Sequence, residues 1–215
     1  GISVENGRIK DEGSLKLKSG LKAMVKRFKT NVYLTPTQDL LISDIKESEK
    51  SEFESLLASY GIPHPTKLSM IQKNSMACPA LPTCGLAITE SERSLPALID
   101  QLEVALNELG LGNERITLRM TGCPNGCARP YSSEIGLVGR AVGTYNIYLG
   151  GNLDGTRLNQ LYAENVPEAD TLNRLIPIFK FYKLKRNQGE QFGNFCDRIG
   201  VEKLKTEVGN GSGKF

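Results

Sequence analysis

Cysteine is the residue type in this 215-residue sequence whose spacing most clearly indicates chemistry. Four of the five cysteines form two pairs, Cys78 with Cys84 (C-x5-C) and Cys123 with Cys127 (C-x3-C). Each pair lies in a segment bounded by proline and glycine, ACPALPTCG and GCPNGCARP. Loops of this composition free the backbone from helix or sheet, and glycine permits a close approach to a bound group. The four thiols are therefore candidates for one shared site.

Three kinds of site are compatible with two such pairs. Disulfides suit a secreted protein, but nothing else in the sequence indicates secretion. A structural zinc site usually has short C-x2–4-C spacings at both ends, which the gap between Cys78 and Cys84 does not match. An iron–sulfur cluster accepts four thiolates from loops with wider spacing. The spacing favours a cluster and leaves zinc and reduced thiols open.

Cys196 belongs to a different pattern. Phe192, Phe195, Cys196 and Ile199 follow the i, i+3, i+4, i+7 spacing of one helix face. This spacing predicts a thiol buried in a helical core rather than a ligand.

The first elements along the chain predict a compact α-β-β-α unit. Residues 14–29 have apolar side chains at helical spacing, and 31–35 and 39–45 have strand patterns. A further helix runs from Phe53 to Tyr60 and stops at Gly61. The segment IPHPTK then serves as a linker, so we place a domain boundary after residue 65.

The second part of the chain contains the cysteines. An irregular stretch is expected over 66–90, a helix over 94–109 and a strand over 115–120 that leads into the second cysteine turn. IGLVGRA and TYNIYLGGN indicate a hairpin, and 156–208 is expected to be mostly helical. Helices and strands are mixed without a regular βαβ order, which favours the α+β class.

The net charge of +3 is unevenly distributed. One basic cluster comprises Lys16, Lys18, Lys22, Lys26, Arg27 and Lys29, and a second comprises Lys180, Lys183, Lys185 and Arg186. Each is either a solvated helix face or a docking surface for an acidic partner. No nucleic-acid motif accompanies them, and no apolar run approaches the roughly 20 residues of a membrane helix. The polar opening GISVENGRIK reads like the interior of a longer protein, so we expect a missing N-terminal part.

Three segments together resemble the assimilatory sulfite reductases, haemoproteins that carry sirohaem and a [4Fe–4S] cluster. They are MACPALPTCGLAITESERSLP (76–96), RMTGCPNGCARPYSSEIGLVG (119–139) and YNIYLGGN (145–152). The resemblance extends over nearly the whole chain. It implies a ferredoxin-like half-domain over 1–65 and a mixed α/β iron–sulfur and sirohaem-binding domain over 66–215.

The resemblance also assigns roles to residues. Cys78, Cys84, Cys123 and Cys127 would bind the cluster, and the Cys127 sulfur would also bridge to the sirohaem iron. Arg129 is a candidate partner for a sirohaem carboxylate, although a surface arginine is an equal alternative. Thr121 and Asn125 would either hydrogen-bond the cofactors or only stabilise the turn. Arg119 is a weaker candidate for a cofactor contact of the same kind.

The implied activity is the six-electron reduction of sulfite to sulfide. The electron donor would be ferredoxin or an NADPH flavoprotein. The segment Ala128-Arg129-Pro130-Tyr131 favours ferredoxin, whereas the segment LGGNLDGTRL resembles the flavoprotein-dependent branch. Basic residues that bind the anion and supply protons are expected in an N-terminal half of the same enzyme, so no catalytic residue is named and the fragment alone should be inactive. The alternatives are a ferredoxin-dependent nitrite reductase and a non-catalytic, zinc-stabilised binding module. The expected compartment is the cytoplasm of a bacterium or the plastid stroma of a plant or alga.

Overall fold

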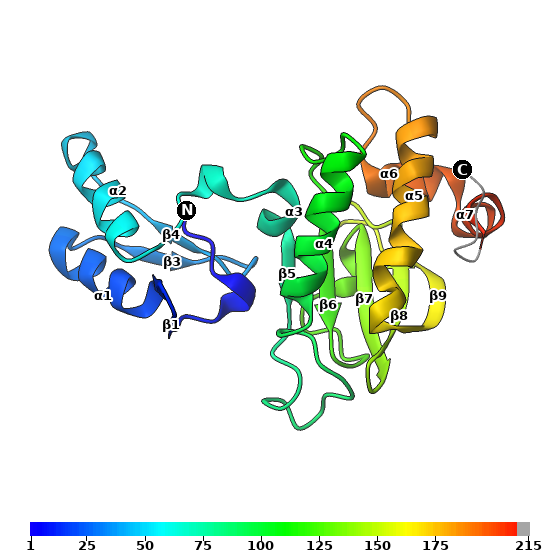
Figure 1. Cartoon of the computed structure of the whole chain (residues 1–215), viewed down its shortest axis with the longest axis horizontal. Helices are drawn as coiled ribbons and strands as arrows, with labels where there is room; N and C mark the ends of the chain where they lie inside the picture. Colours follow the sequence, from blue (N-terminus) through cyan, green and yellow to red (C-terminus); the bar gives the residue numbers. More distant parts are fainter. Residues whose placement is uncertain (210–215) are drawn as a thin grey trace. The chain divides into compact units, whose positions relative to one another are not determined.

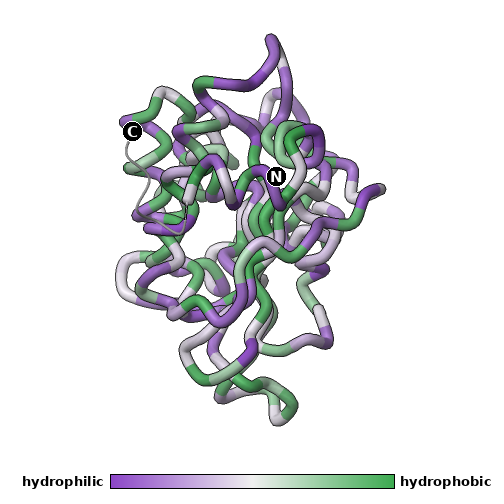
Figure 2. The backbone as a smooth tube through the Cα atoms, turned by 90° about the vertical axis from the view of Figure 1, so that its right-hand side faces the viewer, coloured by the Kyte–Doolittle hydropathy of each residue, from purple (hydrophilic) through white to green (hydrophobic). Residues whose placement is uncertain are grey.

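The computed structural model describes residues 1–209 (Figure 1). The chain divides into two compact units, residues 1–69 and the part from Met70 onward, and each unit has its own hydrophobic core. The predicted division lay after residue 65, and the end of the predicted second domain, 210–215, lies outside the described residues. Hydrophobic and hydrophilic stretches alternate along the backbone (Figure 2), and within 1–209 no helix is long and apolar enough to cross a membrane.

The first unit contains the predicted α-β-β-α order, preceded by a short hairpin. Its elements are β1 (Asp11–Glu12), β2 (Leu15–Lys16), α1 (Leu17–Phe28), β3 (Val32–Leu34), β4 (Leu40–Ile42) and α2 (Lys50–Ser59). β3 and β4 form an antiparallel pair. Helix α2 ends before Gly61, whose positive φ of 69° matches the predicted stop.

The predicted start of the first helix at residue 14 is wrong. Residues 11–16 instead form the β1–β2 hairpin, and the Lys16 amide donates to the Tyr60 carbonyl. The apolar residues with helical spacing begin at Leu17, which is the first residue of α1, so the spacing agrees with the helix and only its predicted start was too early.

The second unit is built on a five-stranded sheet with the order β5-β6-β7-β8-β9. The strands are β5 (Ser75–Ala77), β6 (Leu118–Thr121), β7 (Ile135–Ala141), β8 (Thr144–Leu149) and β9 (Gln160–Pro167). The pairs β5–β6 and β6–β7 are parallel, whereas the pairs β7–β8 and β8–β9 are antiparallel. The predicted hairpin is β7–β8, and the predicted strand at 115–120 is β6.

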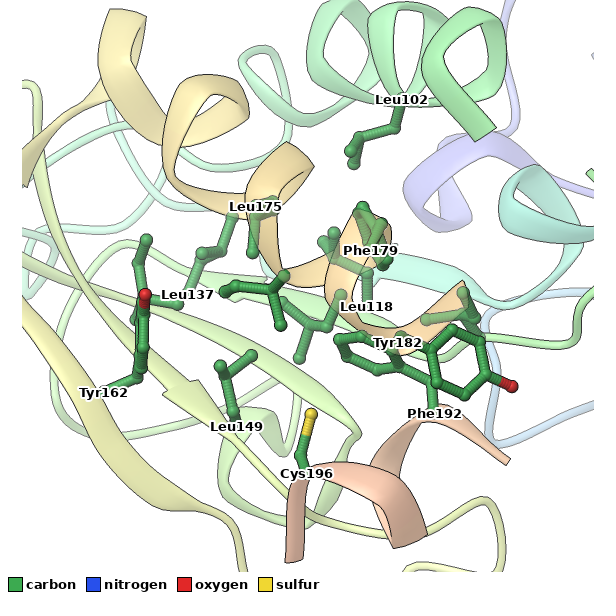
Figure 3. Packing of buried hydrophobic residues seen from close by; sticks show 14 of the residues in the cluster. Leu102, Leu118, Leu137, Leu149, Tyr162, Leu175, Phe179, Tyr182, Phe192 and Cys196 are labelled. Carbon is green, nitrogen blue, oxygen red and sulfur yellow. The ribbon is translucent and has the colours of Figure 1, made fainter. Parts of the chain in front are cut away.

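The helices of this unit are α3 (Met70–Lys73), α4 (Leu95–Glu108), α5 (Thr171–Lys185), α6 (Phe192–Ile199) and α7 (Val201–Val208). Helices α4 and α5 lie over one face of the sheet (Figure 1). Figure 3 shows Leu118 and Leu137 of the sheet packed between Leu175 and Phe179 of α5 and Cys196 of α6. The prediction for Cys196 is confirmed, because the residue is in a helix and 0% exposed.

Two predictions for the second unit are wrong. The stretch 66–90 is not wholly irregular, since it contains α3 and β5. The segment 156–208 is not mostly helical at its start, because 160–167 form β9. Strand β5 has only three residues, and β9 is interrupted by Asn165 with a φ of 51° and by register shifts against β8. Both features hide the alternation by which strands are recognised in a sequence.

A buried carboxylate joins the sheet to helix α6. Glu134 is 0% exposed and accepts hydrogen bonds from the Thr117 amide (2.8 Å), the Thr117 hydroxyl (3.3 Å) and the Gly193 amide (2.8 Å). Burial raises the pKa of Glu134, and the hydrogen bonds from Thr117 and Gly193 oppose that rise. The bond from Gly193 joins Glu134 to a residue 59 positions further along the chain.

The raised pKa of Glu134 predicts a pH-dependent stability. A folded pKa above the ordinary 4.5 favours the protonated form, so this contribution is present below pH 4.5 and is lost as the pH rises through the folded pKa. We expect the free energy of unfolding to fall by about 1.4 kcal/mol for each unit of the pKa shift. Urea unfolding at a series of pH values should show this fall in the wild type and not in Glu134→Gln. The exposed control Glu108→Gln should keep the wild-type profile, and an identical profile in Glu134→Gln would contradict the assignment.

Candidate functional site

The first cysteine of each pair follows the end of one of two parallel strands. Cys78 comes directly after β5, and Cys123 comes two residues after β6. The Cys78 amide donates to the Met120 carbonyl (3.1 Å), which extends the β5–β6 ladder by one step. The Gly122 amide donates to the Cys78 sulfur (3.3 Å). The parallel pairing therefore brings the two cysteine loops together at one edge of the sheet.

The loop that carries Cys84 folds back onto the second cysteine turn. The amides of Ile88 and Thr89 both donate to the Gly122 carbonyl, at 2.9 and 3.0 Å. The Ser91 hydroxyl donates to the Met120 carbonyl at 2.8 Å. These bonds fix the path of the loop independently of its thiols.

Gly122 lies in close contact with the first cysteine loop. A Cβ atom at this position would lie 2.5 Å from the Thr89 carbonyl oxygen and 2.7 Å from the Ala80 side chain. Both distances are shorter than any ordinary van der Waals contact. The contact between the loops therefore requires glycine at residue 122.

The second cysteine turn is closed by its own backbone and supported by an aromatic ring. The Gly126 amide donates to the Cys123 carbonyl (3.4 Å), and Gly126 has a φ of 68°. The Tyr131 hydroxyl donates to the Pro124 carbonyl (3.1 Å), and its ring packs edge-on against Tyr148. The turn thus places Cys123 and Cys127 in a fixed arrangement.

The four thiols differ in burial. Cys78 and Cys123 are buried, Cys84 is partly exposed and Cys127 is exposed. Burial raises the pKa of Cys78, while donors from Gly122, Ala80 and Ser91 lower it and the nearby Cys127 raises it again. Cys78 therefore lies beside the Cys123 turn and within electrostatic range of Cys127.

Cys84 is placed by its loop rather than by contact with another thiol. Its amide donates to the Ala80 carbonyl (2.7 Å), and its carbonyl accepts from the Ala87 amide (3.2 Å). Within residues 1–209 no three His, Cys, Asp or Glu side chains are grouped closely enough to hold a single metal ion. In a [4Fe–4S] cluster each thiolate binds a different iron, so the thiolates stand further apart than the ligands of one ion.

Two arginines lie beside the second cysteine turn. Arg119 is half-buried, and its Nη1 donates to the Arg129 carbonyl (3.3 Å) and the Ser132 hydroxyl (3.1 Å). Burial, followed by the charge of Arg129, lowers the pKa of Arg119. Arg129 is exposed, has a φ of 56° and lies 4.0 Å from the Met76 sulfur through its Nη2. Two cations in proximity favour an anionic ligand between or beside them.

Thr121 and Asn125 have contrasting environments. Thr121 is 0% exposed, and its hydroxyl has no hydrogen-bond partner in the described part of the chain. Asn125 is exposed at the tip of the turn, and among residues 1–209 its side chain makes no hydrogen bond. The hydrogen bonds that stabilise the turn come from Gly126 and Tyr131 instead.

Thr89, Ser91 and Tyr131 position the cysteine loops but were not identified from the sequence. The Thr89 hydroxyl accepts from the Gly143 amide (2.9 Å), and Ser91 contacts both Met120 and Cys78. Their contacts involve residues far away in the chain, so no local pattern signals them. Tyr131 lies close to the second cysteine pair in the sequence, so its aromatic side chain is the one feature from which a role near the turn could have been predicted.

The fold and the paired cysteine loops define an iron–sulfur protein related to the sirohaem reductases. Residues 73–214 match the family described as "Nitrite and sulphite reductase 4Fe-4S domain", and the chain belongs to this family. A [4Fe–4S] cluster fits the observed donor set, because four thiols lie on two loops in mutual contact and the buried Thr121 hydroxyl beside them lacks an acceptor.

Two curated relatives that resemble the chain over nearly its whole length are named as sulfite reductases. The haemoprotein beta-component of an NADPH sulfite reductase from Staphylococcus carnosus is 47% identical over 206 residues, which cover 96% of this chain and 36% of that protein. The ferredoxin sulfite reductase of Synechococcus elongatus is 45% identical over 205 residues, covering 95% of this chain and 33% of that protein. The chain thus spans about a third of these relatives.

Solved structures support the fold. The Mycobacterium tuberculosis NirA protein superposes with a TM-score of 0.74 at 24% identity, covering 86% of this chain and 36% of that one. Dissimilatory sulfite reductase I superposes with a TM-score of 0.63 at 13% identity, covering 88% of this chain and 65% of that one. The predicted α+β class is therefore confirmed.

The packing at Gly122 predicts that a single added methyl group disturbs both cysteine loops. Gly122→Ala forces the Thr89 and Ala80 contacts apart, which should cost about 1–3 kcal/mol of stability and reduce the iron bound per chain. Gly85→Ala, in the Cys84 loop, is a matched control because a Cβ there meets nothing within 4 Å. Thermal unfolding and iron analysis compare the two variants. Equal iron content and stability in both would contradict the proposed role of this contact.

Proposed function

We propose that this chain supplies the cluster-binding part of a sulfite reductase, which reduces sulfite to sulfide with six electrons. The contact between the two cysteine loops at the carboxyl ends of β5 and β6 carries this proposal. Relatives named as sulfite reductases, with nearly half of their aligned residues identical, support sulfite over nitrite as the substrate. Anaerobic purification of the holoprotein, iron and acid-labile sulfide analysis, and a sulfite assay test it.

The proposed ligands of the cluster are Cys78, Cys84, Cys123 and Cys127. When bound, the cluster and sirohaem supply one-electron transfers to an iron-bound substrate. Amide donors from Gly122 and Ala80, which oppose the effect of burial on the Cys78 pKa, would stabilise that thiolate as a ligand. The buried position of Cys78 and Cys123 also limits the access of water to their sulfurs.

Cys127 is the proposed shared ligand of cluster and sirohaem iron. It is the exposed member of the set, so one side of its sulfur is open to a second group. The backbone of the turn holds it, since Gly126 bonds to the Cys123 carbonyl and accepts from the Arg129 amide. A thiolate common to both groups would give electrons a covalent path of a few bonds.

Arg119 and Arg129 are the proposed contacts for sirohaem carboxylates. Arg119 has no carboxylate partner within residues 1–209, and its charge lies near that of Arg129. A carboxylate would relieve the repulsion between the two guanidinium groups. Thr121 and Asn125 remain proposed cofactor contacts, Thr121 through its buried hydroxyl and Asn125 through its exposed amide.

The proposed bridge predicts opposite outcomes for two cysteine substitutions. Cys127→Ser should abolish sulfite reduction and disturb both the haem absorption spectrum and the cluster signal. Cys196→Ser should leave both spectra unchanged and cost only about 1 kcal/mol of stability, because Cys196 lies in the helical core. A Cys127→Ser holoprotein with normal spectra and activity would refute the bridge.

Ferredoxin is the proposed electron donor, although relatives of both donor types match the chain. The proposal is supported by Ala128-Arg129-Pro130-Tyr131 after the second cysteine pair and by the two basic clusters. In the second cluster Lys180, Lys183 and Lys185 are exposed and have no ion-pair partner within residues 1–209. Free surface lysines of this kind attract a small acidic protein.

Electrostatic steering predicts that turnover with ferredoxin depends on salt. At sub-saturating ferredoxin, activity should fall several-fold between 0.1 and 1 M salt, because the Debye length shortens from about 10 Å to about 3 Å. Charge reversal at Lys183 and Lys185 should raise the apparent KM for ferredoxin and leave turnover with a small artificial donor unchanged. Reversal of Lys46 and Lys67, exposed lysines outside both clusters, is the control with the same change in net charge. Turnover with an NADPH flavoprotein but none with ferredoxin would refute the choice of donor.

A further inference from the structure

Thr121 presents a polar group that the protein itself leaves unsatisfied. The residue is 0% exposed, and its hydroxyl has no hydrogen-bond partner within residues 1–209. A buried donor without an acceptor costs about 1–3 kcal/mol relative to a satisfied one. Such a group in a native protein therefore requires an explanation, for example an acceptor supplied by a ligand.

The strand register places this hydroxyl on the cysteine side of the sheet. Leu118 and Met120 of β6 belong to the helical core, so the alternation of the strand directs Thr121 and Arg119 to the opposite face. Arg119 on that face reaches the residues of the second cysteine turn. Thr121 therefore shares a face with the cysteine loops and not with the apolar core.

The neighbours of Thr121 restrict where an acceptor can lie. The parallel register pairs Ala77 with Met120, and the Cys78 amide bonds to the Met120 carbonyl, so the next step of the ladder sets Cys78 beside Thr121. On the other side Thr121 is paired with Val138, whose side chain offers no polar atom. The next residue along the chain, Gly122, bonds to the Cys78 sulfur. An acceptor for the hydroxyl must therefore come from the side of the thiols.

We propose that the Thr121 hydroxyl donates a hydrogen bond to a sulfur atom of the cluster and thereby sets its reduction potential. This inference rests on the proposed function, and it assigns to Thr121 a positioning and tuning role rather than a catalytic one. The cluster's one-electron couple gains negative charge on reduction, and a donor to sulfur stabilises the reduced form. The hydroxyl keeps its proton throughout. Loss of this donor makes the potential more negative.

The test is potentiometric titration of the cluster in the anaerobically purified holoprotein, followed by electron paramagnetic resonance. Thr121→Val removes the hydroxyl while conserving the shape of the side chain, and we expect its potential to shift to a more negative value. Thr121→Ser retains the donor and should keep the wild-type potential. Thr30→Val is the matched control, because Thr30 is a second buried threonine without a hydroxyl partner, in the first unit of the chain.

Each outcome bears on the inference. A Thr121→Val cluster with unchanged potential overturns it and leaves the proposed function intact. Equal shifts in Thr121→Val and Thr121→Ser also overturn it, since packing rather than the hydrogen bond would then be responsible. A shift in the haem potential alone overturns it in favour of a sirohaem carboxylate as the acceptor. Anaerobically purified wild-type protein that contains neither iron nor acid-labile sulfide overturns this inference and the proposed function together.

Discussion

The contact of two loops at the backbone of Gly122 is the constraint on which the site depends. The amide of this residue bonds to the Cys78 sulfur, and its carbonyl accepts from Ile88 and Thr89. Both backbone polar groups of this one residue are thus used to hold the first cysteine loop. A side chain at this position would overlap Thr89 and Ala80. The two cysteine loops can therefore lie this close together in space only because residue 122 has no Cβ atom.

The parallel pairing of β5 and β6 gives this contact its position. Parallel neighbours end at the same edge of a sheet, so loops that follow them start side by side. Leu102 of α4 and Phe179 of α5 pack in one core with Leu118 of the sheet and so bury its opposite face, and Glu134 connects the sheet to α6. The sheet is therefore anchored on the side away from the cysteines, which leaves its other face available to the loops.

The sequence was informative wherever the signal was local. The cysteine spacings, the helix predicted over 94–109 and the β7–β8 hairpin each depend on residues that are close together in the sequence. Strand β5 escaped prediction because three residues are too few to show a period, and β9 because Asn165 adopts a positive φ within it. Thr89 and Ser91 could not be identified because their roles arise from bonds to Gly143 and Met120, which the chain brings near only after folding.

Apart from the bonds to the Cys78 sulfur, the hydrogen bonds that hold the cysteine loops join protein groups that are not proposed metal ligands. The bonds from Ile88 and Thr89 to Gly122, from Ser91 to Met120 and from Tyr131 to Pro124 all join groups other than thiols. Small zinc domains differ in this respect, because binding of the metal supplies their folding free energy. A site whose loops are ordered by the sheet pays less conformational entropy when its ligand binds. The fold of these loops does not depend on polar groups that have no protein partner, such as the Thr121 hydroxyl. Such groups are therefore available to bind the ligand.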